Sequence, residues 1–500
     1  MRVSARTLTQ SLRLRAAAAL LGAIALLSLL PASAARAQGA ASWTDIFLPE
    51  SQEKALAEQE HPKVLAQFGG AYEEPELNAY VQSLVNFLGQ TSNRPDITYQ
   101  VTILNSPIVN AFALPAGYLY VTRGLLALAD SEAELAGVLA HEIGHVTARH
   151  TAQRYSQTMI AQGIVGILGA AGVGSGMGDL QKLAEPLAVM GLTSFSRDHE
   201  HEADLLGIET MSRAGFDPYA MATFLEKLDA KTKLDAQLSG QPANGGGFNL
   251  LSTHPRTPER VQRSIAQARA TRVADPMAAR DIYLSKIDGL LYGDDPKQGF
   301  VRGRLFAHPD LDLRFEVPEG FQMLNGQEAV LARGPNGATI KFDAVKRSGG
   351  SVLGYLRDVW AKDLPLLEAQ RITINGFPAA TGRLEAKLDG QAKDLRLVAI
   401  DTGAAGFYRF QFSSPAPTSR ELETSFIRTA HSFNRLGYSD RRDLKPYRLV
   451  TYRVRQGDTV DGLASWLPFP SDREARFRVL NGLGPRGTLQ PGQVVKLITE

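Results

Sequence analysis

Two histidines and a glutamate, His141, Glu142 and His145, form the pattern with the most evident chemistry in this sequence, HExxH. Residues four apart lie one above the other on the same face of an α-helix, so both imidazoles can bind a single metal ion. Glu142 would hold a carboxylate beside the remaining coordination position. Zinc suits this arrangement, because imidazole is a good zinc ligand and catalytic zinc keeps one position for water. The alternative is a buried helix whose two histidines are hydrogen-bonded core residues.

The residues around this pattern predict the helix that must carry it. Ser131 and Glu134 have the spacing of a capping box, which marks a helix start. In the metzincin class, positions 148 and 151 would hold Gly and His, but this sequence has Ala148 and Thr151, which excludes that class. Apolar residues that would form a buried stripe follow the cap at helical spacing: Leu135, Val138, Leu139 and Val146.

A third protein ligand is needed, and Glu200 is the best candidate. Glu200 and Asp204 are again four apart, on a predicted helix that ends at Gly215. Glu200 can complete a His-His-Glu site, while Asp204 can accept a hydrogen bond from a ligand imidazole and fix its tautomer. His199 and His201 lie about 100° round the helix from Glu200, so we expect them on its solvated flanks.

Together these motifs resemble the M-forty-eight (M48) family of metallopeptidases. The family includes the CAAX prenyl proteases, HtpX and the periplasmic BepA-type proteases. The resemblance covers about residues 45–270. It rests on HEIGH at 141–145, ExEAD at 200–204, NAFALP at 110–115 and YVTRGL at 120–125.

The resemblance implies a role for each of these residues. One Zn²⁺ per chain would be bound by His141, His145 and Glu200, and Glu142 would be the general base. His254 and Arg260 match a family pair that approaches the zinc. His254 could stabilise the oxyanion or occupy the open zinc position as a fourth ligand. A loop histidine that only caps the next helix is the alternative.

Predicted strands at 99–104, 110–114 and 118–122 come just before the metal helix. In zincins this is where substrate is held, since an extended peptide can add itself to a sheet edge. We expect that edge at Asn110, Ala111, Phe112 and Ala113. An ordinary core hairpin is the alternative.

Residues 155–178 carry no charge, and seven glycines lie within 163–178. The stretch is long enough for a membrane span, but each glycine costs a helix about 1 kcal/mol relative to Ala. We therefore expect 158–178 to form a mobile lid or a loop in peripheral contact with a membrane surface. A buried helix remains the alternative.

Residues 1–37 have the features of a secretory signal, with arginines, an uncharged stretch at 16–30 and a small-residue cleavage site near Ala37. An uncleaved anchor is the alternative. Removal takes five arginines and no acidic residue, so the net charge of +2 becomes −3, which gives no reason to expect a nucleic-acid partner. The sequence has no cysteine, which excludes disulfides, a lipid-modified N-terminal cysteine and thiol catalysis.

The predicted fold is multidomain. A mainly α zincin-type (gluzincin) metallopeptidase domain with a small β-sheet occupies 43–275, and a connector occupies 276–303. An α+β domain at 304–438 weakly resembles Mog1/PsbP-like domains, with alternating strands and amphipathic helices. Its strands are expected near 311–317, 338–342, 395–400 and 407–412, and its helices near 352–368 and 418–433.

The tail, residues 449–500, resembles a LysM module of βααβ order. The resemblance rests on the opening segment 452–460, on Asn481-Gly482-Leu483 and on the closing strand 494–498. LysM modules bind N-acetylglucosamine chains, so peptidoglycan is a candidate partner. The tail is a single copy with an irregular Pro468-Phe469-Pro470 connection, which leaves glycan binding open.

These features predict a periplasmic zinc metalloendopeptidase that hydrolyses misfolded or stalled envelope proteins, particularly outer-membrane proteins. Its partners would be those unfolded or misassembled substrates and the outer-membrane assembly machinery. One alternative is a LysM-anchored hydrolase of peptidoglycan cross-links. Another is a non-catalytic periplasmic chaperone or assembly factor whose site is held shut.

Overall fold

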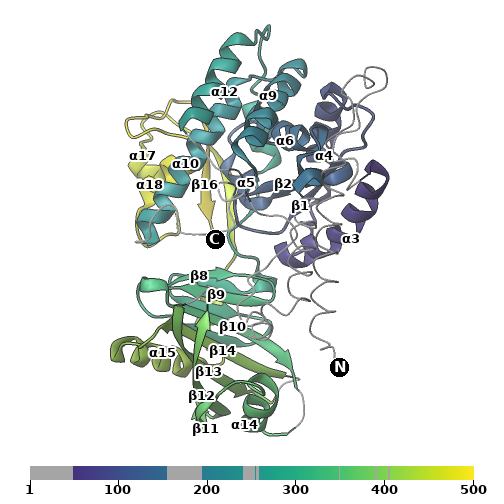
Figure 1. Cartoon of the computed structure of the whole chain (residues 1–500). Helices are drawn as coiled ribbons and strands as arrows, with labels where there is room; N and C mark the ends of the chain where they lie inside the picture. Colours follow the sequence, from purple (N-terminus) through teal and green to yellow (C-terminus); the bar gives the residue numbers. More distant parts are fainter. Residues whose placement is uncertain are drawn as a thin grey trace, which may run out of the picture. The chain divides into compact units, whose positions relative to one another are not determined.

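The structure is a computed structural model of the 500-residue chain (Figure 1). The predicted signal at 1–37 and the glycine-rich segment, including the proposed lid or membrane contact at 158–178, lie outside the residues it describes. Within the described part, no helix is long and apolar enough to cross a membrane. The described residues are 49–154, 194–239, 250, 254, 258–347, 350–388, 391–403 and 406–500.

The first part of the described chain is mainly helical, as predicted. Its helices surround a core that includes Leu135, Leu139 and Ile143, all buried on the metal helix. The helices are α3 (Glu50–Phe68), α4 (Pro75–Thr91), α5 (Arg123–Leu128), α6 (Glu132–Thr147), α9 (Arg197–Arg213), α10 (Tyr219–Ser239), α12 (Pro258–Ala270) and α13 (Arg280–Lys286).

A three-stranded sheet comes before the metal helix α6. Its strands are β1 (Gln100–Leu104), β2 (Ala111–Leu114) and β3 (Tyr118–Thr122), in the order β1-β3-β2. Strand β1 is parallel to β3, whereas β2 is antiparallel to it. The predicted substrate strand therefore lies at an edge of this sheet, and β3 leads directly into α5.

Helices α6 and α9 approach each other closely because glycines lie at their crossing. A Cβ at Gly144 would come 2.9 Å from the carbonyl oxygen of Ala203, and one at Gly207 would come 3.0 Å from the backbone nitrogen of His141. Larger residues would force the helices apart. One half of the predicted capping box is present, since the Ser131 hydroxyl accepts from the backbone N–H of Glu134. The Glu134 carboxylate accepts from the backbone N–H of Asp130, at 2.7 Å, one residue before the expected donor.

The next part of the chain contains a seven-stranded antiparallel sheet. Helix α15 (Arg420–Ser432) packs against it through Phe426, whose ring centroid lies 4.8 Å from that of Phe412 in a tilted arrangement. The strand order is β11-β12-β13-β14-β10-β9-β8. These strands are β8 (Gln322–Asn325), β9 (Ala329–Arg333), β10 (Thr339–Lys346), β11 (Leu367–Ile374), β12 (Phe377–Leu388), β13 (Gln391–Asp401) and β14 (Gly406–Pro415).

The expected helix at 352–368 is wrong over its second half. The observed helix α14 (Val352–Tyr355) continues as one π-helical turn, Leu356–Trp360, and the chain then turns before β11. Pro365 lies in that turn and cannot donate a helical hydrogen bond, so the helix stops short of it.

A smaller antiparallel sheet precedes the seven-stranded sheet in the chain, with strands β5 (Phe300–Arg302), β6 (Leu305–His308) and β7 (Leu313–Glu316).

The tail has the predicted βααβ order, but it is not separate from the helical part. Strand β15 of the tail pairs with β16 and also with β4 (Leu291–Tyr292) from the predicted connector, in the order β16-β15-β4. Tail residues Leu449, Leu497 and Ile498 belong to the same hydrophobic core as the metal helix. The elements are β15 (Tyr447–Arg453), α17 (Val460–Ala464), α18 (Arg473–Leu480) and β16 (Val494–Thr499). The assignment to LysM and the domain boundaries stay predictions.

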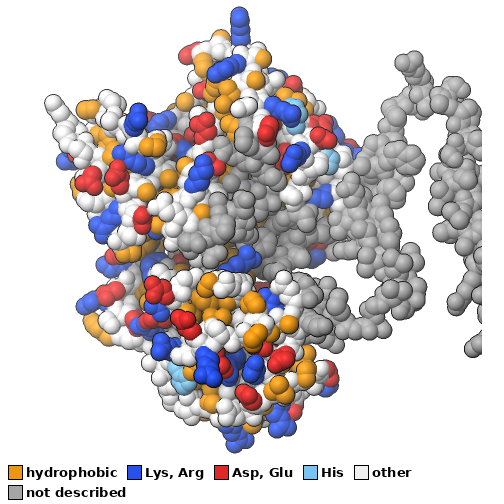
Figure 2. Space-filling view, turned by 60° about the vertical axis from the view of Figure 1, so that its left-hand side comes forward, with side chains coloured by type: hydrophobic (Ala, Val, Ile, Leu, Met, Phe, Trp, Pro, Cys, Tyr) orange, Lys and Arg blue, Asp and Glu red, His pale blue; other side chains and the backbone are white. Residues whose placement is uncertain are grey.

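Acidic and basic side chains are interspersed over the described surface on the face that Figure 2 shows. No large area of one sign gathers on the described residues of that face. A broad basic surface would be needed to bind nucleic-acid phosphates. This face therefore offers no support for a nucleic-acid partner.

Candidate metal centre

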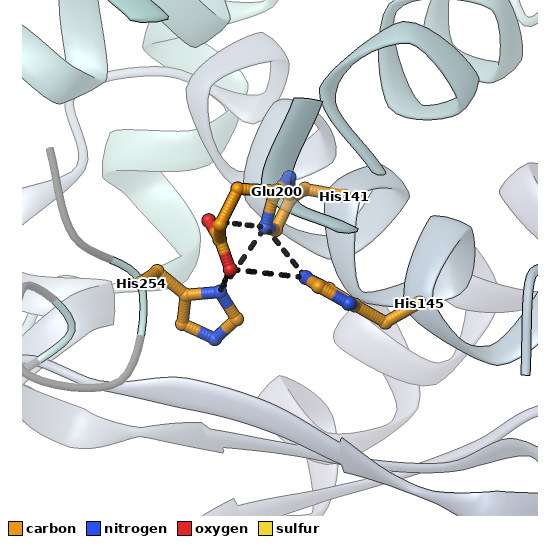
Figure 3. Close-up of side chains that lie close together, drawn as sticks. All are labelled: His141, His145, Glu200 and His254. Carbon is orange, nitrogen blue, oxygen red and sulfur yellow. Dashed lines mark hydrogen bonds and ion pairs between the residues drawn. The ribbon is translucent and has the colours of Figure 1, made fainter. Parts of the chain in front are cut away.

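Four side chains that could hold a metal ion converge between α6 and α9 (Figure 3). His141 and His145 come from α6, Glu200 comes from the first turn of α9, and His254 comes from the chain before α12. One ligand atom from each residue lies within 4.8 Å of the others, and all four residues are buried. The structure thus brings together the three predicted ligands and the predicted fourth residue.

The distances between the ligand atoms are compatible with binding to one metal ion. Nε2 of His141 and Nε2 of His145 are 3.1 Å apart. Glu200 Oε2 lies 3.6 Å from His141 Nε2, and Glu200 Oε1 lies 3.5 Å from His145 Nε2. Zinc bonds of about 2.0–2.1 Å arranged tetrahedrally place neighbouring ligand atoms about 3.3 Å apart. Two imidazoles and a carboxylate at these spacings are therefore compatible with a metal.

His254 lies at the fourth corner of this set. Its Nδ1 is 3.3 Å from His141 Nε2 and 2.8 Å from Glu200 Oε1. Its other ring nitrogen, Nε2, is 3.5 Å from Glu142 Oε1. The imidazole therefore faces the metal ligands with one nitrogen and the predicted general base with the other.

Glu142 is 1% exposed, and neither of its carboxylate oxygens has a hydrogen bond. A buried carboxylate without a donor is costly, about 1–3 kcal/mol or more, and is retained where a ligand or water completes it. Glu142 is one residue from a ligand and contacts His254. The unpaired oxygens fit a site that receives a metal ion and a water molecule.

Asp204 and Arg260 hold the ligands from behind. Asp204 Oδ1 lies 2.9 Å from Nδ1 of His141, so the carboxylate can accept from the imidazole, as predicted. The Arg260 guanidinium donates to both Asp204 oxygens, at 2.6 and 2.8 Å, and also pairs with Glu200. Such partners fix the tautomer and orientation of a metal ligand. Arg260 thus contacts the carboxylates of the site.

Burial and neighbouring charges shift the pKa values of His145 and Glu200 in the directions that metal binding needs, and they shift the pKa of His254 in the opposite direction. Burial lowers the pKa of His145 well below its ordinary value, which keeps the imidazole neutral. Burial alone would raise the pKa of Glu200, but His254 and His145 lower it far below its usual range. Burial would likewise lower the pKa of His254, but the carboxylates of Glu200 and Glu142 raise it above its ordinary value. A neutral imidazole and an ionised carboxylate are the metal-binding forms.

His150 was missed by the sequence analysis. Its Nδ1 lies 3.0 Å from Nδ1 of His145, and its Nε2 lies 3.2 Å from Glu202. His199 stacks on the His150 ring, with centroids 4.2 Å apart, instead of only facing solvent. The only sequence signal was a further histidine five residues after His145. A ligand imidazole needs a partner for its other nitrogen, and a histidine close to His145 in the sequence is a candidate for that partner.

The predicted substrate strand lies beside α6, and its side chains are buried. Asn110 precedes β2 and is fully buried, yet neither atom of its side-chain amide has a hydrogen-bond partner. The carbonyl of Ala113 accepts from the Thr151 hydroxyl at 3.3 Å. Part of the strand edge is therefore already paired, while the Asn110 amide is not.

Sequence comparison agrees with this geometry. The model of Peptidase family M48 matches residues 74–267, which include α6, α9, His254 and Arg260. Residues 74–267 are a Peptidase family M48 domain. The chain is 34% identical over 220 residues to the "Beta-barrel assembly-enhancing protease" of Escherichia coli, across 43% of this chain and 43% of that protein. It is 33% identical over 216 residues to the "Mitochondrial metalloendopeptidase OMA1" of Schizosaccharomyces pombe, across 42% of this chain and 59% of that protein.

The chain thus spans about half the length of these curated relatives, and the M48 domain is the shared part. A solved structure of cyanobacterial PsbP from Synechocystis is 12% identical and covers 28% of this chain and 98% of that chain, with a TM-score of 0.22. A similarity at this level carries no argument about the fold. The Mog1/PsbP-like assignment of 304–438 therefore stays a prediction.

Proposed function

We propose that this chain is a zinc-dependent endopeptidase that hydrolyses misfolded or stalled outer-membrane proteins in the cell envelope. The observation that carries the proposal is the buried carboxylate of Glu142, whose oxygens have no hydrogen bond, beside a buried His-His-Glu-His set. A structural metal site has no use for an unpaired acid next to its ligands. A peptidase needs one, because a base must take a proton from the attacking water.

His141, His145 and Glu200 would hold one zinc ion. When bound, zinc supplies a Lewis acid for the scissile carbonyl and lowers the pKa of a water to about 7. Glu142 takes the proton of the attacking water and passes it to the leaving amine. Its lack of other hydrogen bonds leaves both oxygens free for this transfer.

Asp204 and Arg260 would position the site without touching the substrate. Asp204 orients His141 through the bond to Nδ1, and Arg260 fixes Asp204 and Glu200 through its fork of donors. Arg260 was predicted among the catalytic residues. Its contacts favour a role in holding the ligand carboxylates, since its donors bind Asp204 and Glu200.

His254 would have two roles: a latch that blocks the fourth metal position, and a hydrogen-bond donor to the oxyanion. In the resting enzyme its Nδ1, which lies 3.3 Å from His141 Nε2 and 2.8 Å from Glu200 Oε1, would take the fourth metal position. When it swings out, the same imidazole can donate to the oxyanion of the tetrahedral intermediate. A closed resting site would protect folded envelope proteins from an exported protease.

The edge strand β2, with Asn110 before it, would bind the substrate in an extended form. An unpaired buried amide such as that of Asn110 can donate to one peptide group and accept from another. Residues 110–113 would therefore align the scissile bond with Glu142.

The biological role rests on the export signal predicted at 1–37 and on the name of the Escherichia coli relative. We place the chain in the periplasm, with outer-membrane assembly intermediates as substrates and the assembly machinery as a partner. Any binding of peptidoglycan by the tail would be independent of the cleavage reaction, which does not need it.

A substrate trap tests this function. Glu142→Gln in the full chain should keep its metal but hold substrates without cutting them. Mass spectrometry of cross-linked envelope proteins should find unfolded outer-membrane proteins enriched on this variant. Cleavage of purified sacculi but not of casein by wild type would instead support the wall hydrolase. Full complementation by Glu142→Gln would instead support the non-catalytic chaperone.

A further inference from the structure

A second buried cluster lies at the other end of the metal helix. We define the Lys496 cluster as Asp130, Glu134, Lys227 and Lys496. Lys496 is in β16 of the tail, is 0% exposed, and pairs with Asp130 at 2.8 Å. Lys227 from α10 pairs with Asp130 at 2.5 Å and with Glu134 at 2.7 Å. A residue close to the C-terminus thus completes an ion cluster inside the peptidase domain.

Lys496 also binds the backbone at the corner between α5 and α6. Its ammonium donates to the carbonyls of Ala127, Leu128 and Ala129, at 2.8, 3.0 and 2.8 Å. These carbonyls belong to the end of α5, where helix carbonyls lack partners. The N-cap of α6, Ser131, follows only two residues after Ala129. The Lys496 side chain therefore supplies hydrogen bonds to the carbonyls at the end of α5 and fixes the backbone just before the start of α6.

This corner sets the direction of the metal helix. The chain runs from β3 directly into α5 and then, through residues 127–131, into α6. β3 belongs to the sheet whose edge strand is β2, and α6 carries His141 and His145. A change in the corner would therefore move the metal ligands relative to the proposed substrate strand.

Further hydrogen bonds fix the corner between α5 and α6, and some of them involve residues of the tail. Arg280 donates to the carbonyl of Asp130 and to the carbonyl of Val494 in β16, each at 2.9 Å. Inside the tail, the amide of Asn481 fixes the backbone of Lys496 with two hydrogen bonds, at 2.7 and 2.9 Å. The Lys496 side chain is thus anchored from behind before it enters the peptidase domain.

We propose that Lys496 is a positioning residue through which the tail fixes the metal helix relative to the substrate strand. This inference rests on the proposed peptidase function. The tail is then a part of the peptidase, whatever glycan it does or does not bind. Burial lowers the pKa of Lys496 to about 8, so the ammonium is charged at neutral pH. Burial alone would raise the pKa of Asp130, but Lys496 and Lys227 lower it to about 2, so its partner is charged as well.

The test compares Lys496→Met with a matched control, Arg478→Met, in the full zinc-loaded chain. The hydrogen bonds of Arg478 to described residues stay within the tail, with Glu474 and the carbonyls of Gly484 and Gly487 as acceptors. We expect Lys496→Met to lower kcat at least tenfold and to change KM less than threefold, since a misplacement of about 1 Å costs roughly 10² in rate. Arg478→Met should leave kcat within twofold. Equal losses in the two variants at equal Tm, or an unchanged kcat for Lys496→Met, would overturn the inference.

A double variant and a measurement that does not depend on peptidase activity complete the test. Asp130→Asn combined with Lys496→Met restores charge balance but not the donors to the three carbonyls. It should therefore regain Tm while kcat stays low, whereas recovery of kcat would contradict the positioning role. Amide hydrogen exchange in 131–147 should be faster in Lys496→Met than in Arg478→Met. If wild type cleaves no protein, the proposed function fails, and this exchange difference still decides whether the tail holds the helix.

Discussion

Helix α6 has a buried cluster of charged side chains near each end, and the two clusters differ in how their polar atoms are paired. In the Lys496 cluster, the ammonium has three carbonyl acceptors and a carboxylate. In the metal centre, both oxygens of Glu142 and the Nε2 of His254 lack a hydrogen bond. Burial is similar, since Lys496 is 0% exposed and Glu142 is 1% exposed.

This difference separates a structural cluster from a functional one. A buried charge whose partners are complete stabilises one arrangement of the backbone around it. A buried charge without partners costs stability and is retained where a ligand or substrate supplies them. The same helix therefore contains a cluster of paired charges at one end and a site with unsatisfied polar atoms about ten residues further along.

The largest loss of activity is expected from a Glu→Gln substitution in the metal centre. The same substitution near the other end of α6 provides the comparison. Glu142→Gln should keep about one zinc per chain and lose at least 10³-fold in proteolysis, because the base is gone but the ligands remain. Its free energy of unfolding should be unchanged or higher, since an unpaired buried charge is removed.

Glu134→Gln is the matched control on the same helix. It breaks an ion pair with Lys227 and should lower the free energy of unfolding by about 1–3 kcal/mol. Because Lys496 and its three carbonyl contacts remain in this variant, its kcat should stay within a few-fold of wild type. Peptidase assays and denaturant unfolding measure both. The contrast between the clusters would be lost if both variants showed the same balance of activity and stability.

Removal of a metal ligand should be the next most damaging change. Glu200→Ala should lose both zinc and activity, whereas Glu209→Ala, an exposed residue on the same helix, should keep both. Metal analysis by mass spectrometry after dialysis measures the zinc content. Our ligand assignment is wrong if Glu200→Ala retains zinc while Glu142→Gln loses it.

A smaller effect is expected at His150. Its contact with Nδ1 of His145 should orient that ligand, so His150→Gln should weaken zinc affinity about 10–100-fold without abolishing binding. Competition with a chromogenic chelator measures the affinity. His199→Gln is the control, because His199 stacks on the ring of His150, whereas His150 itself contacts the ligand His145. Equal loss in both variants would mean that His150 acts only through packing.

The smallest expected change is a gain. His254→Ala removes the imidazole from the fourth corner, so it should cleave casein, or itself, a few-fold faster than wild type. Loss of a single oxyanion donor would instead cost roughly 10²–10³ in rate. A variant that keeps zinc but slows by two or more orders of magnitude would show that His254 is catalytic and not a latch.

Much of the metal centre could be predicted from the sequence because its geometry is local. The spacings of His141 with His145 and of Glu200 with Asp204 place each pair on one helix face, whatever the rest of the fold does. The cap at Ser131 likewise depends on neighbours within one turn. Where a local rule was overlooked, as with Pro365 inside the expected helix at 352–368, the prediction failed.

Only the tertiary structure decided which distant side chains complete each cluster. The sequence could name His254 and Arg260 but not the corner that His254 fills or the carboxylates that Arg260 binds. Apart from the spacing of five residues, nothing in the sequence indicated that His150 partners His145, and nothing indicated that Lys496 enters the peptidase domain. Lys496 follows two valines in a short strand, and alternation alone cannot tell a solvated lysine from one that caps a helix. Its partner Asp130 lies more than 360 residues earlier in the chain, and only packing of β16 against α5 and α6 brings the two together.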